Sequence, residues 1–125
     1  MIPHLLIAED DPTTREFLAL LLKRLKFNLD FAEDGLMVVK MWENGDYDLV
    51  LMDVQMPRLD GFEATKAIRK KELERGGHTP ILAMTAHARK EDEESCLAAG
   101  MDAFVSKPID FKKCLELIGQ LIKRC

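Results

Sequence analysis

The sequence has few of the residues that mark several specialised classes of protein. Only 6% of its 125 residues are aromatic, so a surface that stacks nucleic-acid bases is not expected. Its three cysteines, Cys96, Cys114 and Cys125, are odd in number and show no CxxC spacing, which argues against a disulfide scaffold or a zinc site. No apolar run approaches the ~20 residues that cross a bilayer. The first four residues do not resemble a signal peptide, so we expect a cytoplasmic chain without membrane contact.

An excess of positive charge is also absent. The chain has 18 Lys and Arg residues against 22 Asp and Glu residues, a formal net charge of −4. An acidic domain does not bind DNA or an anionic membrane by bulk electrostatics, so direct contact with nucleic acid is not expected. The length fits a single domain over residues 1–125. A composition of 47% hydrophobic and 32% charged residues is typical of a globular protein with its own core.

Short apolar runs alternate with helical patterns along the chain. Four runs, at residues 4–8, 49–52, 81–84 and 103–105, are almost continuously apolar, as expected of parallel strands buried on both faces. A fifth, at residues 28–32, alternates apolar and polar residues, which is typical of an edge strand. Strands that alternate with helices predict an α/β domain with right-handed crossovers.

Local signals support these assignments. In the edge run, Leu29 and Phe31 are expected to face the core and Asp30 to face outward. Asp11, followed by proline, and Asp110 are expected to cap helices. Apolar residues recur at helical spacing in two clear sets, Leu18, Leu21, Leu22 and Leu25, and Phe111, Leu115, Ile118 and Ile122.

Polar residues follow the apolar runs at the points where the strands should end. They are Glu9, Asp10 and Asp11 after the first run, Asp53 after the third, Thr85 after the fourth, and Ser106, Lys107 and Pro108 after the last. Ligands of open parallel sheets bind beyond the carboxyl ends of the strands. If the first and third strands are neighbours, their acids face each other there. The sequence therefore predicts carboxylates, a hydroxyl and an amine on one rim.

Such an acidic cluster requires a cation. Two like charges ~4 Å apart repel by about 4 kcal/mol at an effective dielectric constant near 20. Magnesium relieves this repulsion, uses few carboxylates and leaves coordination sites for phosphate oxygens. Lys107 and Thr85 would then suit a phosphoryl group, and an aspartate among these residues can be a nucleophile that forms an aspartyl phosphate.

Together these motifs resemble the CheY-like receiver domain of two-component response regulators. The matching motifs are Glu9-Asp10, Asp53 with Met56-Pro57 and Asp60-Gly61, Met84-Thr85-Ala86, and Lys107-Pro108. The stretches at residues 85–88 and 100–109 look most like receivers of hybrid histidine kinases. The resemblance implies a flavodoxin-like, doubly wound three-layer sandwich. Its five-stranded parallel sheet would have the order 2-1-3-4-5 and be flanked by five helices.

The resemblance also implies a phosphorylation site and a metal site. Asp53 would accept a phosphoryl group from a histidine kinase or a histidine phosphotransfer protein. Magnesium, or manganese, would be held by Glu9, Asp10, Asp53 and the backbone carbonyl of Gln55. In this family Asp10 would bind the metal directly and Glu9 through water.

The remaining implied roles concern a conformational switch. Lys107 would pair with Asp53 before transfer and with the phosphoryl group afterwards, while Thr85 turns toward that group. Phe104 would be the rotating aromatic, at a position where many members have Tyr. The Lys107–Pro108 peptide bond would be cis. The face made by the fourth helix, fifth strand and fifth helix would then control an output protein or an attached domain.

The resemblance implies a signalling switch and not a turnover enzyme: the only reactions expected of the chain are its own phosphorylation from a phosphodonor and its own dephosphorylation. It also implies a monomer or a weak, phosphorylation-dependent dimer. The chain could be a stand-alone regulator or a receiver from a longer protein. A degenerate receiver that binds partners constitutively is an alternative, although its acids, Thr85 and Lys107 are all present. A haloacid-dehalogenase-type phosphatase is a second alternative, but it would need an acid at the position of Gln55. A flavodoxin-like electron carrier is a third, but the acids after the first strand would repel the phosphate that such a carrier binds there. His87 either tunes hydrolysis or is simply exposed.

Overall fold

The computed structural model describes residues 2–56, 58–86 and 90–123, in which strands and helices alternate as the apolar pattern predicts. The strands are β1 (His4–Ala8), β2 (Asn28–Ala32), β3 (Leu49–Asp53), β4 (Ile81–Thr85) and β5 (Ala103–Ser106). The helices are α1 (Pro12–Arg24), α2 (Gly35–Asn44), α3 (Gly61–Arg75), α4 (Lys90–Ala99) and α5 (Phe111–Lys123). None of the described helices is long and apolar enough to cross a membrane.

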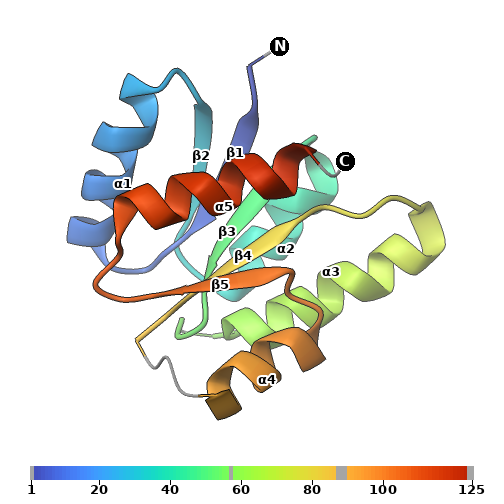
Figure 1. Cartoon of the computed structure of the whole chain (residues 1–125). Coiled ribbons are helices and arrows are strands. Elements are labelled where there is room, and N and C mark those ends of the chain that lie inside the picture. The colour runs from blue at the N-terminus through green and yellow to red at the C-terminus, as the bar shows by residue number, and fades with distance from the viewer. Residues whose placement is uncertain (1, 57, 87–89, 124–125) are drawn as a thin grey trace.

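The strands form one parallel sheet in the order β2-β1-β3-β4-β5, which confirms the predicted fold. Helices cover both faces of the sheet: α1 and α5 lie on one side, and α2, α3 and α4 on the other (Figure 1). The strand order reverses direction between β1 and β3, where Ala8 is in register with Met52. The carboxyl ends of these two strands are therefore adjacent, which is where open α/β sheets bind ligands.

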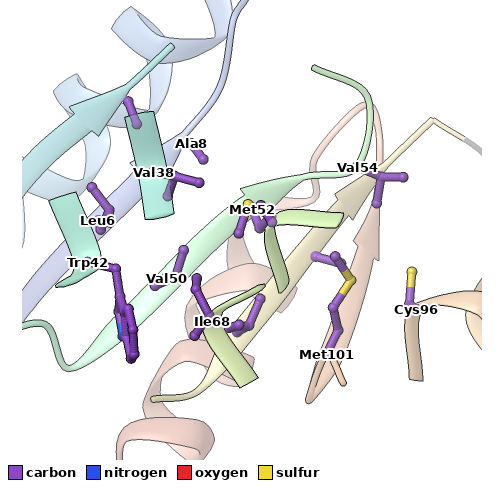
Figure 2. Packing of buried hydrophobic residues seen from close by; sticks show 14 residues of the cluster. Leu6, Ala8, Val38, Trp42, Val50, Met52, Val54, Ile68, Cys96 and Met101 are labelled. Atoms are coloured by element: carbon purple, nitrogen blue, oxygen red, sulfur yellow. The ribbon is translucent and has the colours of Figure 1, made fainter. Parts of the chain in front are cut away.

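The two helical layers explain why the central strands carry apolar residues on both faces. Along β1, Leu5 and Ile7 point into the core cluster under α1 and α5, and Leu6 and Ala8 point into the cluster under α2, α3 and α4. All four side chains are fully buried. Figure 2 shows the second cluster, where Ile68 of α3 lies among the side chains of the strands. Successive residues of a strand face opposite sides, so both must be apolar.

The edge strand β2 is polar on one side, as its alternation predicts. Leu29 and Phe31 are half-buried against the α1 and α5 cluster. Asp30 lies on the opposite face but is not simply solvated, because its Oδ2 accepts hydrogen bonds from His4 Nε2 and Tyr47 Oη, both at 2.8 Å. Asp30 therefore contacts His4 and Tyr47, whereas the alternation of apolar and polar residues in this strand predicts a side chain that simply faces solvent.

Aspartates begin four of the helices. Asp11 accepts a hydrogen bond from the backbone N–H of Thr14 at 3.1 Å, and Asp110 accepts one from the N–H of Lys113 at 3.3 Å, as predicted. The side chains at the N-caps of α2 and α3 act in the same way; these are Asp34 and Asp60. Each cap satisfies a backbone donor that the helix cannot pair internally.

The C-terminal end of α4 is fixed by a Schellman turn. Gly100 has φ +104°, and its N–H donates to Leu97 O while the N–H of Met101 donates to Cys96 O, both at 3.0 Å. Met101 and Cys96 are also buried together in the core cluster, which is the apolar contact typical of this motif. Glycine is favoured here because a positive φ is strained for other residues.

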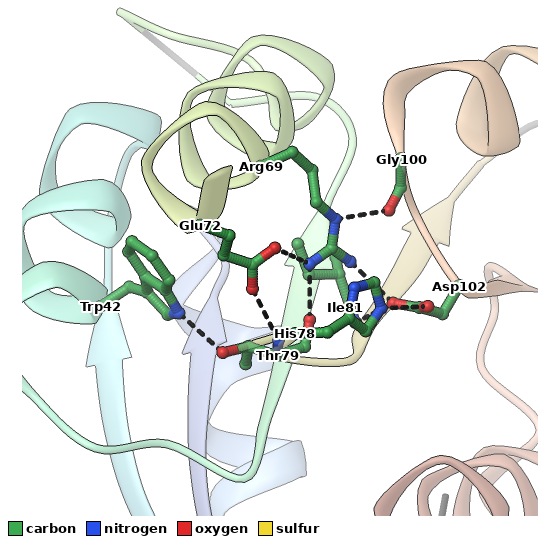
Figure 3. A network of polar contacts seen from close by, with 8 residues as sticks. All are labelled: Trp42, Arg69, Glu72, His78, Thr79, Ile81, Gly100 and Asp102. Atoms are coloured by element: carbon green, nitrogen blue, oxygen red, sulfur yellow. Dashed lines mark hydrogen bonds and ion pairs between the residues drawn. The ribbon is translucent and has the colours of Figure 1, made fainter. Parts of the chain in front are cut away.

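A half-buried polar network joins α3 to the start of β4 and to the loop before β5 (Figure 3). The Arg69 guanidinium donates to Glu72 Oε1 at 2.7 Å, to Asp102 Oδ2 at 2.8 Å, and to the carbonyls of Thr79 and Gly100 at 2.9 Å. The same two carboxylates accept backbone N–H groups from the start of β4. This end of the sheet, opposite the predicted rim, is therefore held together by fully paired charges.

Truncating the core of β3 should cost much of the stability of this domain. Leu51→Ala removes a fully buried side chain from the centre of the sheet, and we expect a loss of about 2–5 kcal/mol in the free energy of unfolding. Leu20→Ala is the control, because Leu20 on α1 is 57% exposed and should change stability by no more than about 0.5 kcal/mol. Urea denaturation measures both, and similar losses would contradict the assigned core.

Candidate functional site

Three carboxylates meet where β1 and β3 end. The backbone N–H of Glu9 donates to Ala32 O at 3.0 Å, which continues the sheet beyond β1 and directs the side chain inward, where it is fully buried. Asp53, the last residue of β3, is 3% exposed, and Asp10 is exposed. Carboxylate oxygens of Glu9, Asp10 and Asp53 all lie within 4.8 Å of one another. The structure thus brings together the three acids that the sequence places on one rim.

Lys107 reaches these acids from β5. Its Nζ lies 3.0 Å from Glu9 Oε1 and 3.2 Å from Asp53 Oδ2. Its backbone N–H donates to the carbonyl of Thr85 at 2.7 Å, so the ends of β4 and β5 are tied together at the site. The peptide bond from Lys107 to Pro108 is cis.

The other predicted residues divide between the site and its surroundings. Thr85 is buried at the end of β4 and lines an open cleft of about 610 Å³. Gln55 lines the same cleft, and its backbone N–H donates to Asp53 Oδ1 at 3.1 Å. Phe104 lies outside the cluster, half-buried against the core under α2, α3 and α4. Pro57, His87 and Cys125 lie outside the described residues.

The electrostatics of the cluster favour a bound cation. Burial, and then the neighbouring Asp53 carboxyl, raise the pKa of Glu9 to about 8, because one ammonium does not offset the loss of hydration. Burial lowers the pKa of Lys107, but its contacts with Glu9 and Asp53 outweigh burial and leave that pKa raised. Glu9 Oε2 is buried and accepts no hydrogen bond from the described residues. A hard divalent cation with oxygen ligands fits this unsatisfied oxygen and its two acidic neighbours.

Two further residues hold the acids in place, and sequence reasoning assigned neither of them to the site. Arg15 of α1 donates from Nη1 to the carbonyls of Glu9 at 3.0 Å and Asp10 at 3.3 Å. Gly61 at the start of α3 packs so closely that a Cβ there would lie 2.4 Å from the carbonyl oxygen of Asp53. In the sequence, Gly61 stands out only as part of the Asp60-Gly61 motif. Nothing local marks Arg15, because its partners are backbone atoms.

Comparison of the chain with known protein families identifies the family to which it belongs. The response regulator receiver domain family matches residues 5–119. The chain belongs to this family. Receiver domains are signalling domains and not classical enzymes, so the alternatives of a phosphatase and an electron carrier are set aside.

Individual receivers resemble the chain over nearly its whole length. The hybrid signal transduction histidine kinase I of Dictyostelium discoideum is 42% identical over 128 residues, which cover 98% of this chain and 7% of that protein. The receiver of sensor histidine kinase PA1611 from Pseudomonas aeruginosa is 33% identical with a TM-score of 0.88, over 98% of this chain and 99% of that one. The Saccharomyces cerevisiae Ssk1 receiver, solved with the phosphotransfer protein Ypd1, is 29% identical with a TM-score of 0.87, over 94% and 88%. The chain therefore spans a small fraction of the kinase and almost all of each solved receiver.

The close approach of α3 to Asp53 in this receiver domain predicts a sensitive position. Gly61→Ala would force the start of α3 away from the backbone of Asp53, so we expect a loss of roughly 1–3 kcal/mol in unfolding free energy. Gly119→Ala is the matched control, because a Cβ at that position in α5 meets no atom within 4 Å. Alanine is the better helix former, and this control should gain up to about 1 kcal/mol. Urea denaturation of both variants checks this, and equal effects would contradict the tight contact at Gly61.

Proposed function

We propose that residues 1–125 act as one phosphorylation-controlled receiver, in which Asp53 accepts a phosphoryl group from a histidine kinase or a histidine phosphotransfer protein. The observation that carries the proposal is the contact of the buried Asp53 carboxylate with Lys107 Nζ at 3.2 Å, inside a cluster that also contains Glu9 and Asp10. The hybrid kinases among its relatives and the Ssk1 receiver solved with Ypd1 support this class of donor.

The transfer itself requires only a nucleophile and fixed positive charge. An oxygen of Asp53 attacks the phosphorus of phosphohistidine, the new P–O bond forms and the P–N bond breaks, and imidazole leaves with the electron pair of that bond. Lys107 is close enough to follow the charge from the carboxylate to the phosphoryl oxygens. Thr85, on the wall of the cleft, would donate its hydroxyl hydrogen to a phosphoryl oxygen.

Magnesium, or manganese in its place, would be held by Glu9, Asp10, Asp53 and the backbone carbonyl of Gln55. The unsatisfied Oε2 of Glu9 and the spacing of the three acids support this assignment. So does the magnesium ion coordinated in the cleft of the Pseudomonas receiver. When bound, the metal supplies positive charge that offsets both the acids and the incoming phosphoryl oxygens.

The output would pass through the β4 and β5 side of the domain. Thr85 would move toward the phosphoryl group, and Phe104 would turn inward and change the face formed by α4, β5 and α5. Phe104 carries no hydroxyl, so it would act through packing and not as a hydrogen-bond donor.

The exposed Phe17 and Leu20 of α1 offer apolar surface to a protein that donates the phosphoryl group. A histidine kinase donor also favours a cytoplasmic location, either within a longer kinase or as a separate regulator.

The first test is phosphorylation of the isolated chain. Incubation with acetyl phosphate and magnesium should add one phosphoryl group to the wild type, seen as a mass increase in the intact protein, and none to Asp53→Asn. Asp46→Asn, an exposed residue before β3, is the control for the change of charge and should behave like the wild type. Equal uptake by Asp53→Asn would refute the assignment of the phosphoacceptor.

A second test concerns the metal alone. Magnesium at about ten times its dissociation constant should raise the free energy of unfolding by about 1.4 kcal/mol, because the folded site binds it and the unfolded chain does not. Asp10→Asn should remove most of this gain without lowering the metal-free stability, since it takes one of the repelling charges out of the acid cluster. Denaturation in magnesium and in a chelator measures both quantities. A full gain in Asp10→Asn would show that this carboxylate is not a ligand.

A further inference from the structure

One carboxylate on the wall of the cleft has no part in the transfer described above. Asp92 lies in the first turn of α4, is half-buried, and lines the same cleft as Asp10, Gln55 and Thr85. No cation among the described residues pairs with it. Its charge therefore lies on the wall of the cleft that the proposed metal ligands Asp10 and Gln55 also line.

The acids that line the cleft come from three parts of the chain, with Asp10 after β1, Asp60 before α3 and Asp92 in α4. Asp60, the N-cap residue of α3, has its charge partly offset, because its Oδ1 accepts the backbone N–H of Glu63 at 2.9 Å. Among the described residues that contact the acid cluster, Lys107 supplies the ammonium, and it already lies against Glu9 and Asp53. No lysine or arginine is among the described residues that line the cleft, so an anion in it is close to Asp92 without a cation on the described wall.

We propose that Asp92 is a specificity-determining residue that disfavours small, highly charged anionic phosphodonors relative to a protein phosphohistidine. A small donor carries its full negative charge past the Asp92 carboxylate. A protein donor presents a phosphoryl group fixed to its own surface, whose cations can face the α4 acids. This inference rests on the proposed function, and it concerns which donor is used and not whether Asp53 is the acceptor.

Two small donors of different charge test the proposal directly. At pH 7 acetyl phosphate is mainly a dianion and phosphoramidate mainly carries one net negative charge. With acetyl phosphate, an oxygen of Asp53 forms the new P–O bond and acetate leaves with the electron pair of the old one. With phosphoramidate the P–N bond breaks and ammonia leaves. The repulsion from one carboxylate is about twice as large for the dianion.

The experiment compares second-order rate constants of phosphorylation, followed by intact mass with magnesium present, for the wild type, Asp92→Asn and Glu94→Gln. Glu94 is exposed on the same helix and does not line this cleft. Glu94→Gln therefore removes one negative charge from α4, as Asp92→Asn does, but away from the cleft. We expect Asp92→Asn to react roughly three to five times faster with acetyl phosphate at about 20 mM salt, and about twice as fast with phosphoramidate. Both ratios should approach one at about 500 mM salt. Glu94→Gln should stay near the wild-type rate, and Asp92→Glu should keep the slow reaction.

Several results would overturn the proposal. Unchanged rates in Asp92→Asn, an equal rise with both donors, or a rise that persists at high salt would each exclude a charge effect at this residue. Asp53→Asn separates the two ideas: uptake that needs Asp53 but ignores Asp92 overturns only this inference. Uptake that persists without Asp53 overturns the proposed function on which it rests.

Discussion

The repulsion among three carboxylates is the constraint on which the rest of this structure depends. Glu9, Asp10 and Asp53 are brought within 4.8 Å of one another because β1 and β3 are adjacent and end at the same edge. Left alone these groups would separate. Burial, and then the neighbouring Asp53 carboxyl, raise the pKa of Glu9, and a proton on Glu9 lowers the repulsion when no metal does. The fold resists this separation through strands that are buried on both faces, and Lys107 crosses from β5 to bridge two of the acids.

The two ends of the strands carry different arrangements of charge. At the amino end of β4, Arg69 pairs with Glu72 and Asp102, and both carboxylates also accept backbone N–H groups, so the charges at this end are internally paired. At the carboxyl end the acids exceed the described cations and an open cleft remains. Helix α4 connects the two: its last turn is fixed by Gly100 and Arg69, while its first turn borders the cleft. Any movement of α4 in response to charge at the site is therefore easiest at its first turn.

The sequence predicts the parts of this structure that depend on local pattern or on strand ends. Continuous apolar runs identify buried parallel strands, and Asp11 and Asp110 identify helix starts, because each signal lies within a few residues of its effect. Arg69 and Asp102, by contrast, are 33 positions apart and have no local mark. Arg15 bonds to carbonyl oxygens, which every residue has, so its role cannot be predicted from side-chain types. Asp92 appears in the sequence as one of several acids at a helix start, and only the packing of α4 beside the cleft distinguishes it.

A count of formal charge shows how the proposed metal and phosphoryl group would share one site. Three ionised carboxylates and Lys107 sum to −2, which a single divalent cation brings to neutrality. The proposed phosphorylation of Asp53 would replace one carboxylate charge with the −1.5 to −2 that is typical of a phosphoryl group, so the same cation and the same ammonium would still meet the added oxygens. Without the cation, the phosphoryl group would enter a cluster whose buried Glu9 oxygen already has no partner among the described residues. The electrostatics that make the metal-free cluster unfavourable are thus the reason to expect that the proposed transfer to Asp53 requires the metal.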